Sequence, residues 1–164
     1  MNKIYIAGPD VFEKDSIEIG KKYSELCKEY GFSGNYPLDN EVNFNQTKQK
    51  IALDIFRANE KLIDESDIVI ANLNSFRGKE ADSGTVWECG YAYAKEKRVY
   101  GYMDSTKDYI KQFPDAQRQD GMFWDENGSS IEDFNHPINL MIACSALEIV
   151  EGGFEDVLKS IEKK

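Results

Sequence analysis

Two carboxylates, Asp82 and Glu88, lie close together in the stretch DIVIANLNSFRGKEADSGTVWECGYA, which spans residues 67–92. When two carboxylates face one sugar, one can attack the anomeric carbon while the other handles a proton. Neighbouring carboxylates also push their pKa values apart, so that one can stay protonated near neutral pH. This pair is therefore the first place in the sequence to look for catalysis.

Each carboxylate also has a purely structural interpretation. Thr85-Val86-Trp87-Glu88 fits the S/T-x-x-E capping box, in which Glu88 would only accept a hydrogen bond from a backbone amide. Asp82 could be a loop residue or a helix cap. In the catalytic interpretation the helix N-terminus favours the ionised form of Glu88, which a nucleophile needs. The residues alone leave both interpretations open.

Tyr5 is the third residue with a possible chemical role. It lies in the run KIYIA, Lys3–Ala7, which is typical of a buried strand ended by a Gly-Pro turn. Alternation along a strand places Tyr5 on the face opposite Ile4 and Ile6. A lone strand aromatic is usually core, but a buried tyrosine hydroxyl needs a partner, and a carboxylate above the adjacent strand would serve.

The carboxylate pair lies in a strand–loop–helix unit. Ile68–Ala71 is an apolar run typical of a fully buried strand, a polar loop follows over 72–83, and Gly84–Ala94 has apolar residues at helical spacing. Such a unit puts its loop at the carboxyl edge of a parallel sheet, where α/β proteins keep their sites.

The rest of the chain alternates in the same way. Asn59, beside the apolar face of one predicted helix, would be either a hydrogen-bonded pin or a ligand contact. The segment 104–137 is long, polar and aromatic-rich, and a loop of that length is usually functional or mobile. Alternation of strands and helices predicts one α/β domain over residues 1–164 with a parallel sheet and right-handed crossovers. Further strands are expected at Lys3–Ala7, Phe32–Leu38, Arg98–Met103 and Leu147–Val150, a polar loop at Asp39–Phe44, and helices at Asp15–Tyr30, Lys48–Glu65, Ile138–Ser145 and Phe154–Lys164.

Composition and charge argue against several classes of partner and site. The 164 residues carry a formal net charge of -10, which makes nucleic acid polymers and anionic membranes poor partners. No apolar run is long enough to span a membrane and the chain begins directly with a strand, so a cytoplasmic protein is expected. Cys27, Cys89 and Cys144 are expected to be free thiols. The single histidine, His136, argues against a histidine-rich metal site and a Ser-His-Asp triad, and neither GxGxxG nor a P-loop is present.

Four segments together resemble the nucleoside 2-deoxyribosyltransferases. They are KIYIAGPDVF, the helix with Asn59, the run that ends DSGTVWECGYA, and PINLM at 137–141, and they occur in the family's order over nearly the whole chain. The chain is most similar to the branch with an FRG-x-E-x-D-x-G loop, which tends towards purine deoxynucleosides. The resemblance implies a flavodoxin-like three-layer sandwich with a five-stranded parallel sheet.

It also implies a double displacement without metal or organic cofactor. Glu88 would attack C1′ of a 2′-deoxynucleoside and expel the base, and a second base would intercept the deoxyribosyl ester with net retention. Asp82 would assist proton transfer to and from the base, and Tyr5 would orient the nucleophile. The substrates would be 2′-deoxynucleosides and free nucleobases.

The resemblance further implies a homo-oligomer with shared active sites. Asn139 would contact the 5′-hydroxyl in a neighbouring subunit's site, Met141 would line the same pocket, and Phe12 would stack near the base. The full set of predicted substrate-binding residues is Gly8, Phe12, Asn59, Phe76, Arg77, Asn139 and Met141.

Two alternatives stay open. The first is a hydrolase on the same fold, a 2′-deoxynucleoside 5′-monophosphate N-glycosidase, which needs a phosphate pocket. No serine cluster stands beside Gly8-Pro9, and Arg77 is the only arginine in the central loop. The second is a nucleotide-sensing domain of the same shape, which fold alone does not exclude; the carboxylate pair argues against it.

Overall fold

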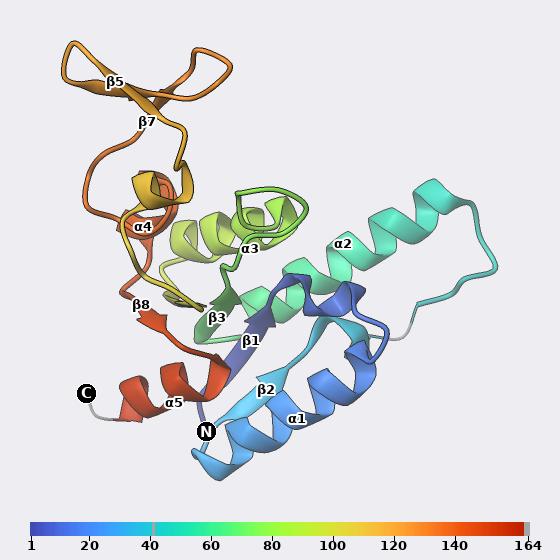
Figure 1. Cartoon of the computed structure of the whole chain (residues 1–164). Coiled ribbons are helices and arrows are strands. Elements are labelled where there is room, and N and C mark those ends of the chain that lie inside the picture. The colour runs from blue at the N-terminus through green and yellow to red at the C-terminus, as the bar shows by residue number, and fades with distance from the viewer. Residues whose placement is uncertain (41, 163–164) are drawn as a thin grey trace.

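A five-stranded parallel sheet forms the centre of the molecule in the computed structural model, which describes residues 1–40 and 42–162 (Figure 1). The strands are β1 (Lys3–Ala7), β2 (Ser33–Asn35), β3 (Ile68–Asn72), β4 (Arg98–Met103) and β8 (Glu148–Glu151). Their order across the sheet is β2-β1-β3-β4-β8, and all four pairings are parallel. This is the flavodoxin-like arrangement that the family resemblance implies.

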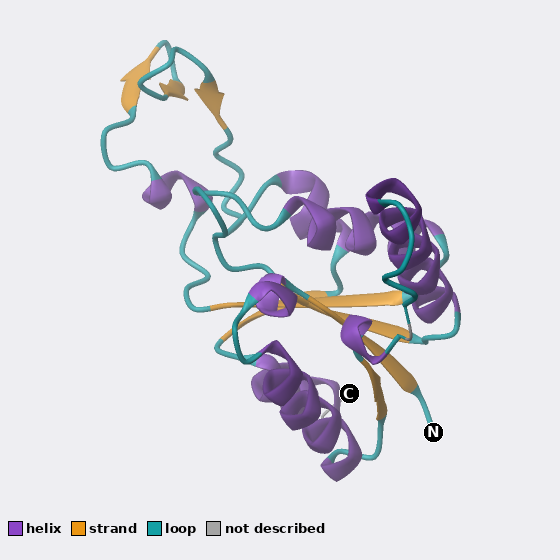
Figure 2. Cartoon of the chain, turned by 90° about the vertical axis from the view of Figure 1, so that its right-hand side faces the viewer, coloured by secondary structure: helices purple, strands orange, loops and turns teal. Residues whose placement is uncertain are grey.

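Helices cover both faces of the sheet, which Figure 2 shows nearly edge-on. One face packs on α1 (Ser16–Glu29) and α5 (Phe154–Glu162). The other packs on α2 (Lys48–Asp64), α3 (Ser83–Ala94) and α4 (Leu140–Ser145). The resulting three layers have a hydrophobic core on each side of the sheet.

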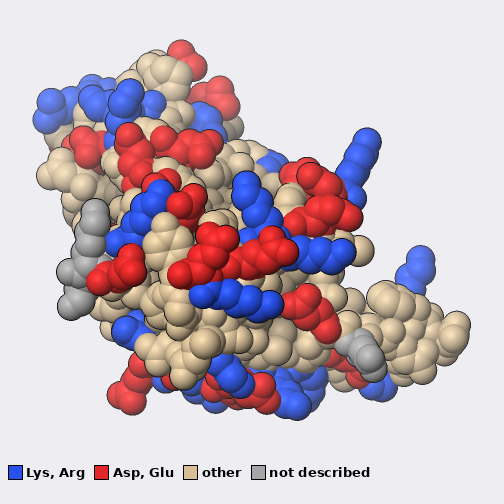
Figure 3. Space-filling view, turned by 90° about the horizontal axis from the view of Figure 1, so that it is seen from below, with Lys and Arg blue, Asp and Glu red and all other residues tan. Residues whose placement is uncertain are grey.

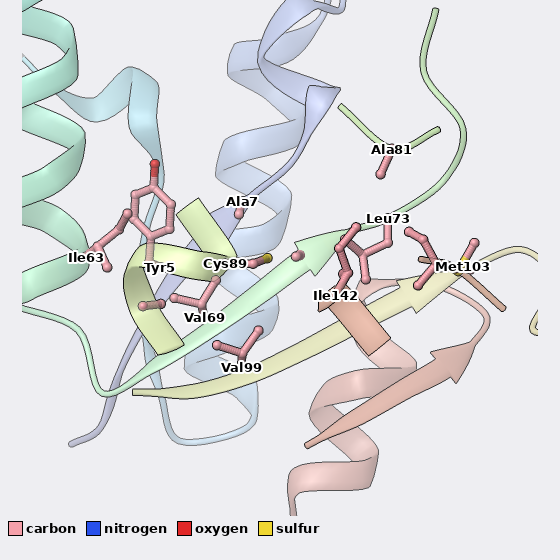
Figure 4. Close-up of a cluster of buried hydrophobic side chains, with 13 residues drawn as sticks. Tyr5, Ala7, Ile63, Val69, Leu73, Ala81, Cys89, Val99, Met103 and Ile142 are labelled. Atoms are coloured by element: carbon pink, nitrogen blue, oxygen red, sulfur yellow. The ribbon is translucent and has the colours of Figure 1, made fainter. Parts of the chain in front are cut away.

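Alternation along β1 divides its side chains between these two cores. Ile4 and Ile6 belong to the core beneath α1 and α5. Tyr5 points the other way, into the core that it shares with Val69 of β3 and Cys89 of α3 (Figure 4). The predicted orientation of Tyr5 is therefore confirmed.

One predicted strand ends earlier than expected, and two other predicted segments include residues outside the described part of the chain. The second strand was predicted at Phe32–Leu38 but ends at Asn35, because a 3-10 turn over Pro37–Asp39 follows and proline has no N–H to donate to a strand ladder. Of the predicted loop at 39–44 and the predicted closing helix at 154–164, residues 41 and 163–164 lie outside the described part of the chain.

The segment 104–137 has more regular structure than the predicted loop. It contains a 3-10 helix, η3 (Tyr109–Gln112), and an antiparallel sheet of β5 (Gln117–Gln119), β6 (Met122–Trp124) and β7 (Ser130–Ile131). Asp120 and Gly121 join β5 to β6 with φ values of 53° and 83°, as a type I′ hairpin turn requires. The small sheet projects beyond the main body of the molecule (Figure 1).

The surface mixes both signs of charge. On the face seen from below, Lys and Arg side chains lie among Asp and Glu side chains (Figure 3). None of the described helices is both long and apolar enough to cross a membrane. Cys27 and Cys89 are buried and Cys144 is exposed, and all three are free thiols.

Candidate active site

The central contact of the site joins Tyr5 of β1 to Glu88 of α3. The Tyr5 hydroxyl donates a hydrogen bond of 2.6 Å to Glu88 Oε1. Tyr5 is fully buried and Glu88 is half-buried, one position before the buried Cys89. The buried ring of Tyr5 therefore fixes the position of a carboxylate that belongs to a different layer of the molecule.

The electrostatics of this pair follow from burial. The pKa of Glu88 is raised to about 7, chiefly by burial; the Tyr5 hydrogen bond lowers it and the nearby Asp82 charge adds a smaller rise. Burial and the Glu88 charge raise the pKa of Tyr5 well above its usual range, so Tyr5 stays a neutral donor. Burial therefore raises the pKa of Glu88 at this position, although the first turns of a helix favour the ionised form of a carboxylate.

Asp82 is the N-cap of α3. Its Oδ2 accepts from Thr85 N at 2.9 Å and from Thr85 Oγ1 at 3.0 Å. The capping interpretation of Asp82 is confirmed, whereas the capping-box interpretation of Glu88 is wrong, because Thr85 is the third helical residue and not the cap. The second carboxylate oxygen of Asp82, Oδ1, has no hydrogen-bond partner among residues 1–40 and 42–162.

Asp82 and Glu88 border one cavity of about 540 Å³, a size that suits a small organic ligand. Gly8, Phe12 and Asn59, three of the residues predicted to bind substrate, line it as well. Glu88 also borders an adjoining hollow of about 370 Å³ beside Asn59. Large apolar side chains that line the main cavity yet stay exposed are Phe12, Ile17, Leu38, Phe44 and Ile55.

Phe76 and Arg77 do not line this cavity, but both contact Phe12, which does. The Phe76 ring stacks on Phe12 with centroids 5.6 Å apart and planes 13° apart. The Arg77 guanidinium carbon lies 4.6 Å from the Phe76 ring centroid and 5.1 Å from that of Phe12. Both residues therefore support the aromatic wall from outside the cavity lining.

Asn59 is both hydrogen-bonded and placed on the cavity wall. Its Oδ1 accepts from Asn40 Nδ2 at 3.3 Å, and Asn40 also donates to Pro37 O at 2.9 Å. The Asn59 amide nitrogen has no partner among the residues that the structure describes, so it can donate to a ligand in the cavity.

Asn139 and Met141 are not brought to this cavity. Asn139 caps α4, since its Oδ1 accepts from Met141 N at 3.0 Å and its Nδ2 donates to Glu132 at 2.7 Å. Met141 is 73% exposed and borders a separate hollow of about 320 Å³ between α3 and α4. Within one chain, neither residue lies against Glu88.

The family model described as nucleoside 2-deoxyribosyltransferase matches residues 4–141. The chain belongs to this family. Among solved structures it is similar to a 2-desoxiribosyltransferase from Leishmania mexicana, with a TM-score of 0.80 and 29% identity over 99% of this chain and 98% of that one. A 2-deoxyribosyltransferase from Bacillus psychrosaccharolyticus shares the fold, with a TM-score of 0.61 and 22% identity over 95% and 90% of the two chains.

A curated relative, an uncharacterized protein of Schizosaccharomyces pombe, is 29% identical over 119 residues. The match covers 71% of this chain and 56% of that relative, so the chain spans little more than half the length of the curated relative it matches.

In this deoxyribosyltransferase-family chain, residues that follow β2 line the cavity although no sequence pattern indicated them. Leu38, Asn40 and Phe44 line the cavity but fell in a stretch assigned to strand or polar loop. The available signal was topological: β2 pairs with β1, so the residues after both strands meet at one sheet edge. No three His, Cys, Asp or Glu side chains within the described ranges are grouped so that they could hold a metal ion.

Proposed function

We propose that this member of the family transfers 2-deoxyribose between nucleobases through a covalent deoxyribosyl ester on Glu88. One observation carries the proposal: the Glu88 carboxylate faces a cavity of nucleoside size while a buried tyrosine hydroxyl holds it at 2.6 Å. A carboxylate held in this way is oriented for attack on an anomeric carbon.

In the first displacement, Glu88 forms a bond to C1′ as the bond between C1′ and the base nitrogen breaks. The electron pair of the broken bond goes to the base, which takes up a proton. Asp82 lines the same cavity and keeps one carboxylate oxygen unengaged within the described ranges, so the one proton that the Asp82–Glu88 pair holds can reach the base through Asp82 as Glu88 gives it up.

The second displacement reverses the first with a different base. The nitrogen of the incoming base attacks C1′, the ester bond breaks, and Glu88 leaves as a carboxylate. The proton of the incoming base returns to Asp82, so the enzyme ends in its starting state. Two inversions at C1′ give net retention.

The apolar cavity wall supports a nucleobase as the group bound beside the sugar. Phe12 offers a ring face at the cavity, stiffened by the stack with Phe76 and the guanidinium of Arg77. A flat heteroaromatic base gains stacking energy from such a wall, and the Asn59 amide can donate to a base or sugar oxygen.

We extend the proposal to a homo-oligomer in which Asn139 and Met141 serve a neighbouring subunit. Asn139 caps α4 and Met141 lies in its first turn, and neither residue lines the cavity of its own chain; Met141 is largely exposed. Residues in such a position can contact substrate only in another copy.

Incubation with deoxyinosine, with and without free adenine, tests the function. The proposal expects deoxyadenosine and hypoxanthine when adenine is present, and loss of both products in Glu88→Gln, whose fold should be intact. Free deoxyribose as the sole sugar product in both tubes would show a hydrolase. Turnover of deoxynucleoside 5′-monophosphates alone would show the N-glycosidase alternative, and binding without turnover would show a sensing domain.

A further inference from the structure

A side-chain hydrogen bond joins the loops that follow the two strands beneath the cavity. Asn72, the last residue of β3, donates from Nδ2 to Asp10 Oδ2 at 3.0 Å. Asp10 belongs to the single 3-10 turn η1 (Pro9–Phe12) that follows β1. These strands are neighbours in the sheet, so the bond spans the crevice between their carboxyl ends, where open α/β sheets bind ligands.

The bond packs against the backbone of Gly8, which lines the cavity. A Cβ atom at Gly8 would lie 2.5 Å from Asp10 Oδ2 and 2.9 Å from Asn72 Cβ. Any side chain at this position would therefore force the two residues apart. Glycine is required here because the bridge passes directly over its Cα atom.

Further hydrogen bonds hold both ends of this bridge. Asp10 Oδ1 accepts from the Tyr23 hydroxyl of α1 at 3.3 Å. Asn72 Oδ1 accepts from Asn74 N at 3.1 Å and Asn74 Nδ2 at 3.0 Å. Asn74 Oδ1 in turn accepts from Asp104 N, beyond β4, at 2.8 Å. One polar network thus ties together the ends of β1, β3 and β4.

We propose that Asp10 and Asn72 are positioning residues that hold the base-binding wall of the cavity in place. Asp10 lies two residues before Phe12 in the same short turn, so the bridge fixes both Gly8 and Phe12 relative to β3. Neither Asp10 nor Asn72 lines the cavity, and they act only through these neighbours. The inference rests on the proposed function, because it assumes that a nucleobase binds against Phe12.

Loss of the bridge should affect binding and not the chemical step. Glu88 is held by Tyr5 from the core of the sheet, independently of the η1 turn. The KM values for deoxyinosine and adenine should therefore rise while kcat and the pH dependence of kcat stay near wild type. A residue that only stabilised the fold would lower the melting temperature without this split.

An exchange of the two side chains is the sharpest test. Asn72→Asp sets two carboxylates against each other and should raise both KM values about 10-fold, the loss expected for a hydrogen bond to a charged group. In D10N/N72D the amide and the carboxylate change places, so the bond returns and the donors of Asn74 still find an acceptor. The double variant should recover KM to within about threefold of wild type.

Two further variants complete the test. If Asn72→Asp does not fold, Asp10→Ala can replace it, because this substitution removes the bridge without placing a second carboxylate in it. Ser66→Ala is the control: Ser66 is a buried side chain that donates to Leu62 O at 2.7 Å and accepts from Asn35 Nδ2 at 3.1 Å. It lies before β3, at the other end of the strand, so its loss should lower the melting temperature and leave KM unchanged.

Dissociation constants for adenine and deoxyinosine, measured by calorimetry, separate this inference from the proposed function. Weaker binding in Asn72→Asp, with recovery in D10N/N72D, supports the positioning role of the bridge, even if the wild-type protein binds these ligands without catalysing transfer. Wild-type affinity in both Asn72→Asp and Asp10→Ala, or a folded exchanged pair that does not recover, overturns the bridge alone. A wild-type protein that neither binds nor transfers overturns both proposals.

Discussion

The carboxyl group of Glu88 is held at a pKa of about 7, well above its ordinary value, chiefly because its surroundings desolvate it. A desolvated carboxylate is a better nucleophile than a solvated one, but its charge destabilises the folded chain. Reactivity and stability are therefore linked at this one side chain. The raised pKa therefore makes the free energy of unfolding depend on pH, and this dependence can be measured.

Glu88→Gln should stabilise the protein at alkaline pH. Between the ordinary pKa of 4.5 and about 7, the folded chain holds a proton that the unfolded chain loses, so this group's contribution to stability is greatest at low pH and is lost as the pH rises through 7. At pH 8 the substitution should raise the free energy of unfolding by about 3 kcal/mol, and at pH 5 it should change little. Urea unfolding at both pH values measures this, and an equal change at the two would contradict the burial argument.

Tyr5→Phe should shift the pH dependence of the reaction. The Tyr5 hydrogen bond lowers the pKa of Glu88, so its removal should move the acid limb of kcat/KM to higher pH. Loss of a hydrogen bond to a charged group should also reduce kcat/KM about 10-fold or more. A pH–rate profile of the variant tests both effects, with the melting temperature as the control for folding; an unmoved acid limb would show that the hydroxyl does not act on Glu88.

At the scale of the element, the residue that caps α3 is also one of the two carboxylates proposed to take part in the reaction. Asp82 ends the loop, caps the helix through Thr85 and borders the cavity. A capping bond fixes the side chain, so the carboxylate is already placed when substrate arrives. The same helix presents Glu88 over β1, where the Tyr5 hydroxyl meets it.

Asp82→Asn separates these two roles, because asparagine caps a helix about as well as aspartate but carries no charge. The melting temperature should stay near wild type, kcat should fall about 10-fold or more through the loss of proton transfer, and the acid limb should move to lower pH, since the Asp82 charge raises the pKa of Glu88. Steady-state kinetics with a thermal melt distinguish the roles. A full rate in a folded variant would leave Asp82 as a cap alone.

The elements themselves were largely predictable from apolar periodicity. β4 has the predicted bounds, and alternation placed Tyr5 on the correct face. The capping-box pattern at Thr85 misled because Asp82, Ser83 and Thr85 are all acceptable caps, and local sequence does not choose among them. The small sheet of β5–β7 escaped prediction because its strands are two or three residues long and largely exposed, so they carry no apolar alternation.

Contacts between segments that are far apart in the chain could not be predicted from the sequence. Asp10 and Asn72 are 62 residues apart, and neither lies in a pattern that indicates the other. Asn59 was predicted as a pin or a ligand contact, and its partner Asn40 comes from a loop with no periodicity. What topology could predict was the shared edge where such residues meet.

At the scale of the whole molecule, exposed apolar side chains collect on the outer layer around α3 and α4. Trp87 is 45% exposed, Tyr93 60% and Met141 73%. Clusters of exposed apolar side chains mark sites of association. Tyr93 of α3 and Met141 of α4 line the hollow between these two helices, close to the α4 cap Asn139, and this supports the proposed sharing of active sites between subunits. Trp87 lies on the other side of α3, where its ring packs on Phe56 of α2.

Subunit complementation tests the sharing. Glu88→Gln and Asn139→Ser should each be inactive alone, and serine keeps the cap of α4. In a random mixture of dimers, one site in each mixed dimer regains both wild-type residues, so activity should return to about a quarter of wild type. Mixtures that stay as inactive as their parents, despite subunit exchange shown by native mass spectrometry, would contradict a site completed in trans.

The most direct measurement is the intact mass of the protein after incubation with deoxyinosine in the absence of an acceptor base, followed by peptide mapping. We expect a mass gain of one deoxyribosyl group on the peptide that contains Glu88, its release as deoxyadenosine when adenine is added, and no such gain in Glu88→Gln. Rapid turnover by a protein that is never modified, or an adduct that persists in Glu88→Gln, would contradict this expectation.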